Sequence, residues 1–93
     1  MEIKQEKRLT DFFKALANPW RLRIIELLSQ KEYSVTELCE ILKKTESVMS
    51  RHLNRLRLGG ILEYKDEGAK HKYYINKKNA ESILSAARAQ LFR

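Results

Sequence analysis

Hydrogen-bonding and cationic side chains recur at helical spacing within the stretch Thr45–Leu58. Ser47, Arg51 and Asn54 stand at i, i+4 and i+7, with Arg55 beside them. Hydroxyl, guanidinium and amide groups can read the edges of nucleic-acid bases, and cationic groups can bind phosphate. A polar helix face that meets only solvent would show the same spacing, so this stripe alone supports both interpretations equally.

The opposite side of the same stretch is apolar. Met49, Leu53 and Leu56 also stand at i, i+4 and i+7, on the other side of a helix that advances by about 100° per residue. The pattern predicts a helix over about residues 46–58, capped by Thr45 and ended by Gly59-Gly60, which suit a left-handed turn. A core beneath this apolar stripe would turn the polar stripe outward.

A short helix is predicted immediately before this one. Ser34-Val35-Thr36-Glu37 fits a capping box, and Tyr33 and Leu38 could form the hydrophobic staple around it. The helix would run over about Val35–Leu42, with Lys43-Lys44 as a tight connection to the next. Two such helices make a helix-turn-helix, although helical hairpins that bind nothing share the pattern.

A basic hairpin is predicted after the helix pair, over about residues 61–75. The strand formers are Ile61, Leu62 and Tyr64 and then Tyr73-Tyr74-Ile75, and Glu67-Gly68-Ala69-Lys70 is a suitable turn between them. Such a "wing" could reach phosphate or the minor groove. A solvated hairpin is the alternative, because its acidic residues offset part of the charge. The basic residues of the hairpin are Lys65, Lys70, His71 and Lys72.

Helices are predicted at both ends, over about residues 3–17 and 77–92, and a further helix over Trp20–Leu28 restarts at Asn18-Pro19. The apolar stripes of the terminal helices exceed what a small core would cover, so we expect them to pair with a second copy of the chain. The alternative is that the adjacent phenylalanines Phe12 and Phe13 are both buried in the protomer's own core. The expected interface residues are Leu9, Phe12, Phe13, Leu16, Ile83, Leu84, Ala87 and Leu91.

Composition limits the classes of protein that fit. The 93 residues suit one small domain over residues 1–93. The 19 Lys and Arg against 12 Asp and Glu give a net charge of +7, which favours a polyanionic partner. No apolar run approaches the roughly 18 residues that span a bilayer, and the start, MEIKQEKRL, lacks the apolar segment of a signal peptide. We therefore expect no membrane partner and an intracellular location. An enzyme is disfavoured, because no Gly-rich phosphate loop, nucleophile–base pair or acidic metal cluster is visible.

Three segments together resemble the ArsR/SmtB family of winged-helix transcriptional repressors. Residues 12–24, FFKALANPWRLRI, are similar to the family's FKALADPTRLRIL opening. Residues 50–53, SRHL, with Leu56 and residues 60–62, are similar to its SRHL recognition segment, and Gly68 with residues 73–75 is similar to its wing. The resemblance implies a homodimer that binds operator DNA and releases it when an effector binds.

The chain departs from the metal-sensing members that it resembles. Ser34 and Thr36 stand where their short helix carries a cysteine pair, and the last helix has no His and only Glu81 as an acid. We therefore expect neither a metal nor another cofactor. Cys39, the only cysteine, is read as a half-buried hydrophobe first, as a reactive thiol or intersubunit disulfide partner second, and as a metal ligand last.

The sequence thus predicts a mainly α fold with a small β-hairpin, a winged helix-turn-helix of order α-α-α-α-β-β-α that is dimeric through its terminal helices. The predicted function is sequence-specific regulation of transcription, as a repressor on an inverted-repeat operator in the nucleoid. A non-specific architectural DNA binder and a protein-interaction module are the alternatives. The expected base readers are Ser47, Ser50, Arg51 and Asn54. The expected phosphate and wing contacts are Thr45, His52, Arg55, Arg57, Lys65, Lys70, His71 and Lys72.

Overall fold

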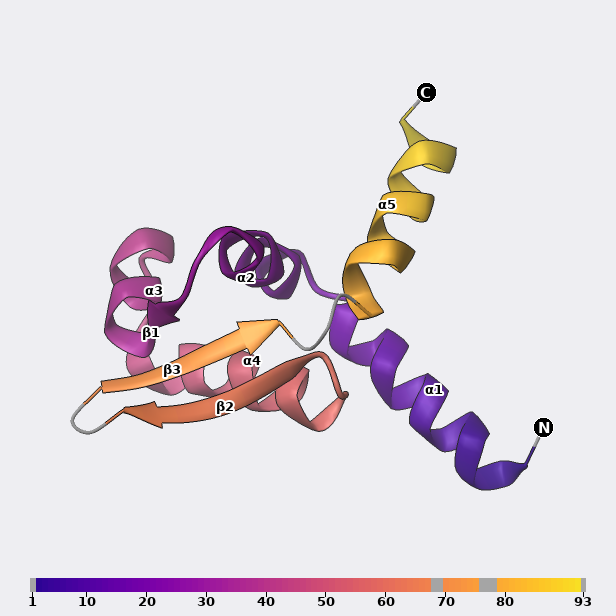
Figure 1. Ribbon diagram of the computed structural model, residues 1–93, viewed down its shortest axis with the longest axis horizontal. Helices are drawn as coiled ribbons and strands as arrows, with labels where there is room; N and C mark the ends of the chain where they lie inside the picture. Colours follow the sequence, from indigo (N-terminus) through magenta and orange to yellow (C-terminus); the bar gives the residue numbers. More distant parts are fainter. Residues whose placement is uncertain (1, 68–69, 76–78, 93) are drawn as a thin grey trace.

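The computed structural model describes residues 2–67, 70–75 and 79–92, and for residues 66, 67, 70–72, 74 and 75 it describes the backbone. Helices dominate this part of the chain, and a small sheet lies against them (Figure 1). The elements in order are α1 (Ile3–Leu16), α2 (Pro19–Gln30), β1 (Tyr33–Ser34), α3 (Val35–Leu42), α4 (Glu46–Leu58), β2 (Leu62–Glu67), β3 (Lys70–Ile75) and α5 (Asn79–Leu91). The predicted winged helix-turn-helix is confirmed, with a two-residue strand, β1, added to the expected hairpin.

Side-chain caps determine where α2 and α3 begin. The Asn18 side chain accepts hydrogen bonds from the backbone N–H groups of Trp20 and Arg21, at 2.9 and 3.2 Å, at the start of α2. Ser34 and Glu37 form the predicted capping box of α3, with bonds of 3.0 and 3.1 Å. Each bond satisfies a backbone group that the first helical turn leaves unpaired. Local sequence therefore sets the start of both helices.

The core lies where α2, α3 and α4 meet the sheet and the end of α1. Met49, Leu53 and Leu56 are fully buried in it, which confirms the predicted inward stripe of α4. Leu38 from α3 and Ile24 from α2 are also fully buried. Burial of each such aliphatic side chain contributes roughly 1.5–3 kcal/mol, so the orientation of α4 about its own axis is strongly fixed.

The sheet has strand order β1-β3-β2, and both pairings are antiparallel. Tyr73 is the partner of Tyr33 on one side and of Tyr64 on the other. The Tyr64 and Tyr73 rings meet edge to face at a centroid distance of 5.2 Å. The middle of the predicted turn, residues 68–69, lies outside the described residues.

Helices α1 and α5 extend away from the body in different directions from neighbouring points (Figure 1). Two residues attach the N-terminal end of α5 to the body. Ala80 is fully buried, and Asn79 Nδ2 donates to the Gly60 carbonyl at 2.9 Å. The assignment of Leu16 to the dimer surface is wrong, because Leu16 is only 7% exposed within the protomer's own core. That position lies at the end of α1, where the helix meets α2 and α4.

The two adjacent phenylalanines of α1 have different environments. Phe12 is half-buried against the core, whereas Phe13 is 52% exposed and meets the Phe12 ring edge to face at 5.5 Å. Burial of both phenylalanines in the protomer's own core is therefore wrong for Phe13, and contact of Phe13 with a second copy stays a prediction. Within the described residues, no helix combines the length and the apolar character that crossing a membrane requires.

Candidate DNA-binding surface

The outward side of α4 carries all four residues expected to read bases. Ser47, Ser50, Arg51 and Asn54 are exposed, and the fully buried stripe lies on the other side of the helix. Their positions along an α-helix place them within one sector of about 100°. The helix therefore presents two hydroxyls, one guanidinium and one amide together.

A hydrogen bond on this face affects which donor and acceptor groups the Asn54 amide presents outward. Arg57 Nη2 donates to Asn54 Oδ1 at 2.6 Å. An amide has a donor nitrogen and an acceptor oxygen with two lone pairs, and the bond from Arg57 occupies one of those lone pairs. The Nδ2 group is a donor, so it suits acceptors such as purine N7 or O6. Arg57, expected as a phosphate contact, positions the Asn54 amide in this structure.

Thr45 and Ser47 form the N-terminal end of α4. Thr45 Oγ1 accepts from the Val48 backbone N–H at 3.3 Å and lies 3.5 Å from Ser47 Oγ. Thr45 is thus the predicted cap. A helix N-terminus carries partial positive charge that favours anions, so this end of α4 is compatible with a nearby phosphate.

A cationic pocket borders the recognition face. Its volume is about 230 Å³, and its lining residues are Arg21, Val48, Arg51, His52 and Arg55. The Arg21 guanidinium enters it from α2 and makes three polar contacts: Nε donates to the Ala15 carbonyl at 2.7 Å, Nη2 to the Lys14 carbonyl at 3.1 Å, and Nη1 lies 3.4 Å from His52 Nδ1. Arg21 therefore links the end of α1 to α4.

Burial and the positive charge of this pocket shift the pKa values of His52 and Arg21. Burial, and then the charges of Arg21, Arg51 and Lys44, lower the pKa of His52 below its ordinary value. Burial and the charge of Arg55 likewise lower the pKa of Arg21. A His pKa below its usual value of about 6.5 keeps the imidazole neutral at pH 7, so one ring nitrogen is an acceptor there.

His52 was predicted from the sequence to contact phosphate, and no role was predicted for Arg21. These two residues are 31 positions apart, and no local periodicity connects them. Arg21 lies within the segment 12–24 that carries the family resemblance, so the motif contained the residue without indicating its partner.

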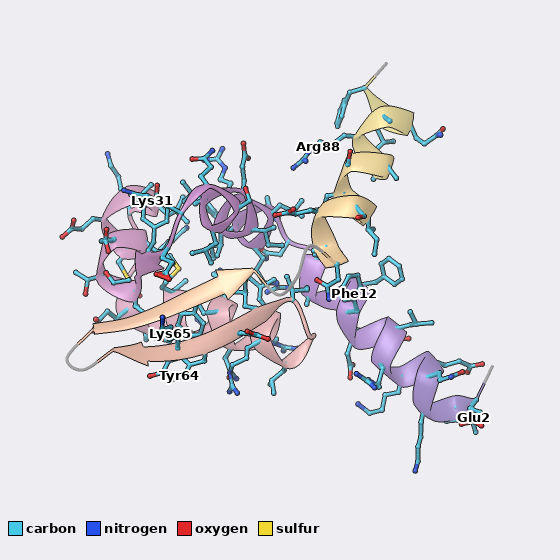
Figure 2. The ribbon with its side chains drawn as sticks, in the orientation of Figure 1. Glu2, Phe12, Lys31, Tyr64, Lys65 and Arg88 are labelled. Carbon is cyan, nitrogen blue, oxygen red and sulfur yellow. The ribbon has the colours of Figure 1, made fainter. Side chains whose placement is uncertain are left out.

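The wing carries Lys65, whose side chain is exposed on β2 (Figure 2). The strand register pairs Lys65 with Lys72, Asp66 with His71, and Glu67 with Lys70. Two lysine positions thus lie opposite each other, which concentrates positive charge across the ribbon. The side chains of Lys70, His71 and Lys72 lie outside what the structure describes.

Cys39 lies half-buried on α3 and packs against the core. Burial, and then the carboxylates of Glu46 and Glu40, raise the pKa of its thiol. A raised pKa disfavours the nucleophilic thiolate, so this environment favours a packing role. Among the residues described, no three His, Cys, Asp or Glu side chains gather in a way that could hold a metal ion. Both the redox role and the expected lack of a metal stay predictions.

A helix-turn-helix with an outward polar face, followed by a β-ribbon, defines the winged helix-turn-helix class. The family model described as "Bacterial regulatory protein, arsR family" matches residues 18–64, half of the chain. The chain belongs to this family, which confirms the resemblance seen in its motifs. The family consists of transcriptional regulators, which are not enzymes.

Two relatives named as transcriptional repressors are similar over most of this chain. A transcriptional repressor SmtB homolog from Synechocystis is 35% identical over 74 residues, which are 80% of this chain and 55% of that protein. The transcriptional repressor PagR of Bacillus anthracis is 36% identical over 75 residues, 80% of this chain and 75% of PagR. The chain therefore spans little more than half the length of the Synechocystis relative.

Solved structures share the fold. The solution NMR structure of a homodimeric winged helix-turn-helix DNA-binding domain from Mycobacterium bovis, a possible ArsR-family transcriptional regulator, is 26% identical and has a TM-score of 0.87. The match covers 97% of this chain and 86% of that domain.

Proposed function

We propose that the chain is a homodimeric transcriptional repressor that reads an inverted-repeat DNA operator with α4. The observation that carries this proposal is the contrast between the two sides of that helix. Its inward stripe is fully buried, and its outward side bears Arg51 and Asn54 beside two serines. Buried anchoring fixes which side chains face outward, and discrimination between bases requires such fixed geometry.

In this proposal α4 enters the major groove. Arg51 reads guanine through O6 and N7, and Asn54 donates from Nδ2 to a purine acceptor while Arg57 holds its oxygen. Ser47 and Ser50 contact neighbouring base edges. Arg55, at the pocket, and the helix N-terminus at Thr45 bind backbone phosphates.

The wing supplies contacts that do not depend on sequence. Lys65, with the lysines at 70 and 72 and His71, reaches phosphate or the minor groove beside the site. The net charge of +7 favours DNA, which is polyanionic, over partners with neutral surfaces. On this account the protein works in the nucleoid, with no membrane, metal or cofactor.

Pairing through the terminal helices would present two copies of α4. Leu9 and Phe13 on α1 and Ile83 and Leu91 on α5 are exposed apolar side chains, with Ala87 among them. A groove of about 430 Å³ is lined by residues of α1 including Leu9 and Phe12, by Gly59 and Gly60, and by Asn79 of α5. A second copy would cover this surface, in line with the homodimeric form of the Mycobacterium bovis relative.

The test is selection of duplexes from a random pool, followed by competition of the selected duplex against bulk DNA. We expect strong preference for a sequence with two related half-sites about one helical turn apart. The variant Arg51→Ala should lose about 1–3 kcal/mol of that preference, or roughly 5- to 100-fold. Arg88→Ala is the matched control, because Arg88 lies on α5 toward α2 (Figure 2).

Three results would contradict parts of the proposal. A ratio near one between selected and bulk DNA would favour the architectural binder. Lack of DNA retention at moderate salt would favour the protein-interaction module. Equal loss in Arg51→Ala and Arg88→Ala would show that Arg51 contributes charge and does not read a base.

A further inference from the structure

Arg21 is the residue through which three helices meet at one point of the DNA-binding surface. It starts on α2, donates to two carbonyls at the end of α1, and reaches the ring of His52 on α4. An arginine side chain carries donors and no acceptor. The contact between Arg21 Nη1 and His52 Nδ1, at 3.4 Å, is therefore a hydrogen bond only if Nδ1 holds a lone pair.

That requirement determines the tautomer of His52. A neutral imidazole with a lone pair on Nδ1 carries its proton on Nε2. We propose that Arg21 is a positioning residue that holds His52 as the Nε2–H tautomer, so that His52 donates to a DNA backbone phosphate seated in the pocket beside α4. This inference rests on the proposed function, because it assumes that α4 approaches DNA.

The charge of the pocket favours a phosphate there. Arg51 and Arg55 line it from α4, Arg21 lines it from α2, and Lys44 acts on His52 from the turn before α4. The carboxylate of Asp11 borders the neighbouring hollow beside Arg55, but Lys7 Nζ already binds it at 3.1 Å. Cations clustered in this way repel one another, and a phosphate offsets that repulsion with charge-assisted hydrogen bonds.

The size and position of the pocket agree with such a ligand. The pocket volume is about 230 Å³. One water occupies roughly 30 Å³ in the liquid, so the pocket has room for a group much larger than a single water. Arg51 borders both the pocket and the outward face of α4, so a phosphate held here would lie beside the base that Arg51 reads. The phosphate contact would then fix the register of α4 in the groove.

The first measurement is the proton position on His52, by long-range proton–nitrogen NMR of the protein labelled in histidine. We expect the wild-type ring to carry its proton on Nε2 near neutral pH. In Arg21→Met the preference for a proton on Nε2 should be lost and the pKa of His52 should rise, because the substitution removes a hydrogen-bond donor and a positive charge. Arg21→Lys should restore part of both effects, and Arg23→Met is the control, with the same charge change on the same helix.

A wild-type ring protonated on Nδ1 would overturn the inference. So would a tautomer and pKa that are the same in Arg21→Met and in Arg23→Met. Circular dichroism and the fluorescence of the single tryptophan report whether each variant is folded, so loss of the fold is distinguished from loss of the contact.

The second measurement places the phosphate. Neutral methylphosphonate groups are introduced one at a time along the selected duplex. We expect one position in each half-site at which the wild type loses about tenfold or more in affinity, while Arg21→Met and His52→Ala lose much less. If the variants remain as sensitive as the wild type at every position, the pocket holds no backbone phosphate.

Two further experiments distinguish failure of the proposed function from failure of the inference about Arg21 and His52. If no sequence is selected, the proposed function fails, and the inference is then tested on a random duplex by the salt dependence of binding. Arg21→Met should lower that slope by about one, because it also removes a cation that lines the phosphate pocket, and Arg23→Met should not; equal slopes overturn the inference. Free phosphate is the alternative ligand of the pocket, and titration of the protein with inorganic phosphate alone tests it. Tight binding that shifts the NMR signals of His52 would reassign the pocket to free phosphate.

Discussion

Replacement of Gly59 by alanine should weaken the attachment of α1 to α4. The backbone of Gly59 has φ = −76°, which any residue adopts, so the cost does not come from backbone strain. A Cβ at this position would lie 2.7 Å from the Cβ of Ala15, and 3.3 Å from the carbonyl oxygens of Arg55 and Asp11. None of these atoms lies at the end of a flexible side chain, so α1 itself must move.

The size of the effect follows from two opposing contributions. Overpacking of this kind costs about 1–3 kcal/mol. Replacement of glycine by alanine also restricts the unfolded chain, which returns about 0.4–1 kcal/mol. We expect a net loss of about 1–2 kcal/mol in the free energy of unfolding. For a domain of this size, each kcal/mol lowers the melting temperature by roughly 4–8 °C.

The assay is urea unfolding followed by circular dichroism at one fixed protein concentration, because pairing of chains makes stability depend on concentration. Adding Ala15→Gly should recover part of the loss in Gly59→Ala, with a coupling of at least about 0.5 kcal/mol. Gly60→Ala is the control, because Gly60 has φ = +83° and an added Cβ there would meet nothing within 4 Å. Its replacement should cost about 1–2 kcal/mol through the backbone alone, and Ala15→Gly should not recover that loss.

Close contact between Gly59 and Ala15 is ruled out if Gly59→Ala is as stable as the wild type. It is also ruled out if Ala15→Gly recovers both glycine replacements equally, because Gly59 faces Ala15 and Gly60 does not.

Three further outcomes are expected. The pKa of His52 is lowered on folding, so the unfolded chain binds more protons. The stability tied to His52 is complete above its unfolded pKa of about 6.5 and is lost as the pH falls below it, and His52→Gln should flatten that part of a stability-versus-pH curve. The Ser34 side chain caps α3, so Ser34→Ala should cost about 1 kcal/mol in urea unfolding, whereas Ser29→Ala, near the end of α2, should cost less. Lys44 Nζ lies 3.7 Å from the centroid of the Trp20 ring. Lys44→Gln should therefore cost about 0.5–1 kcal/mol and change tryptophan fluorescence, and an unchanged spectrum would contradict that contact.

Features that depend on neighbouring residues were predictable from the sequence. The capping box at Ser34 and Glu37, the cap at Asn18 and the two sides of α4 follow from spacing within one or two helical turns, and the structure contains all of them. A one-position error in helix register would expose Leu53 and would bury Asn54 or Arg55 in its place, so burial constrains this pattern strongly.

Features that depend on distant residues were not predictable. Strand β1 has two residues and exists because Tyr33 and Ser34 pair with β3, far along the chain. The contact between Arg21 and His52 joins separate helices in the same way. Leu16 shares the apolar spacing of Phe13, and periodicity alone does not tell whether a stripe faces its own core or a second copy.

In the proposed function α4 reads bases with Arg51 as a member of a symmetric pair. The decisive measurement is selection from a random duplex pool, run in parallel with the wild type and with Arg51→Ala. We expect two related half-sites for the wild type, and for the variant the same site with relaxed preference at one base pair in each half. This proposal is contradicted if both proteins select the same sequence with equal preference at every position, or if the wild type selects none.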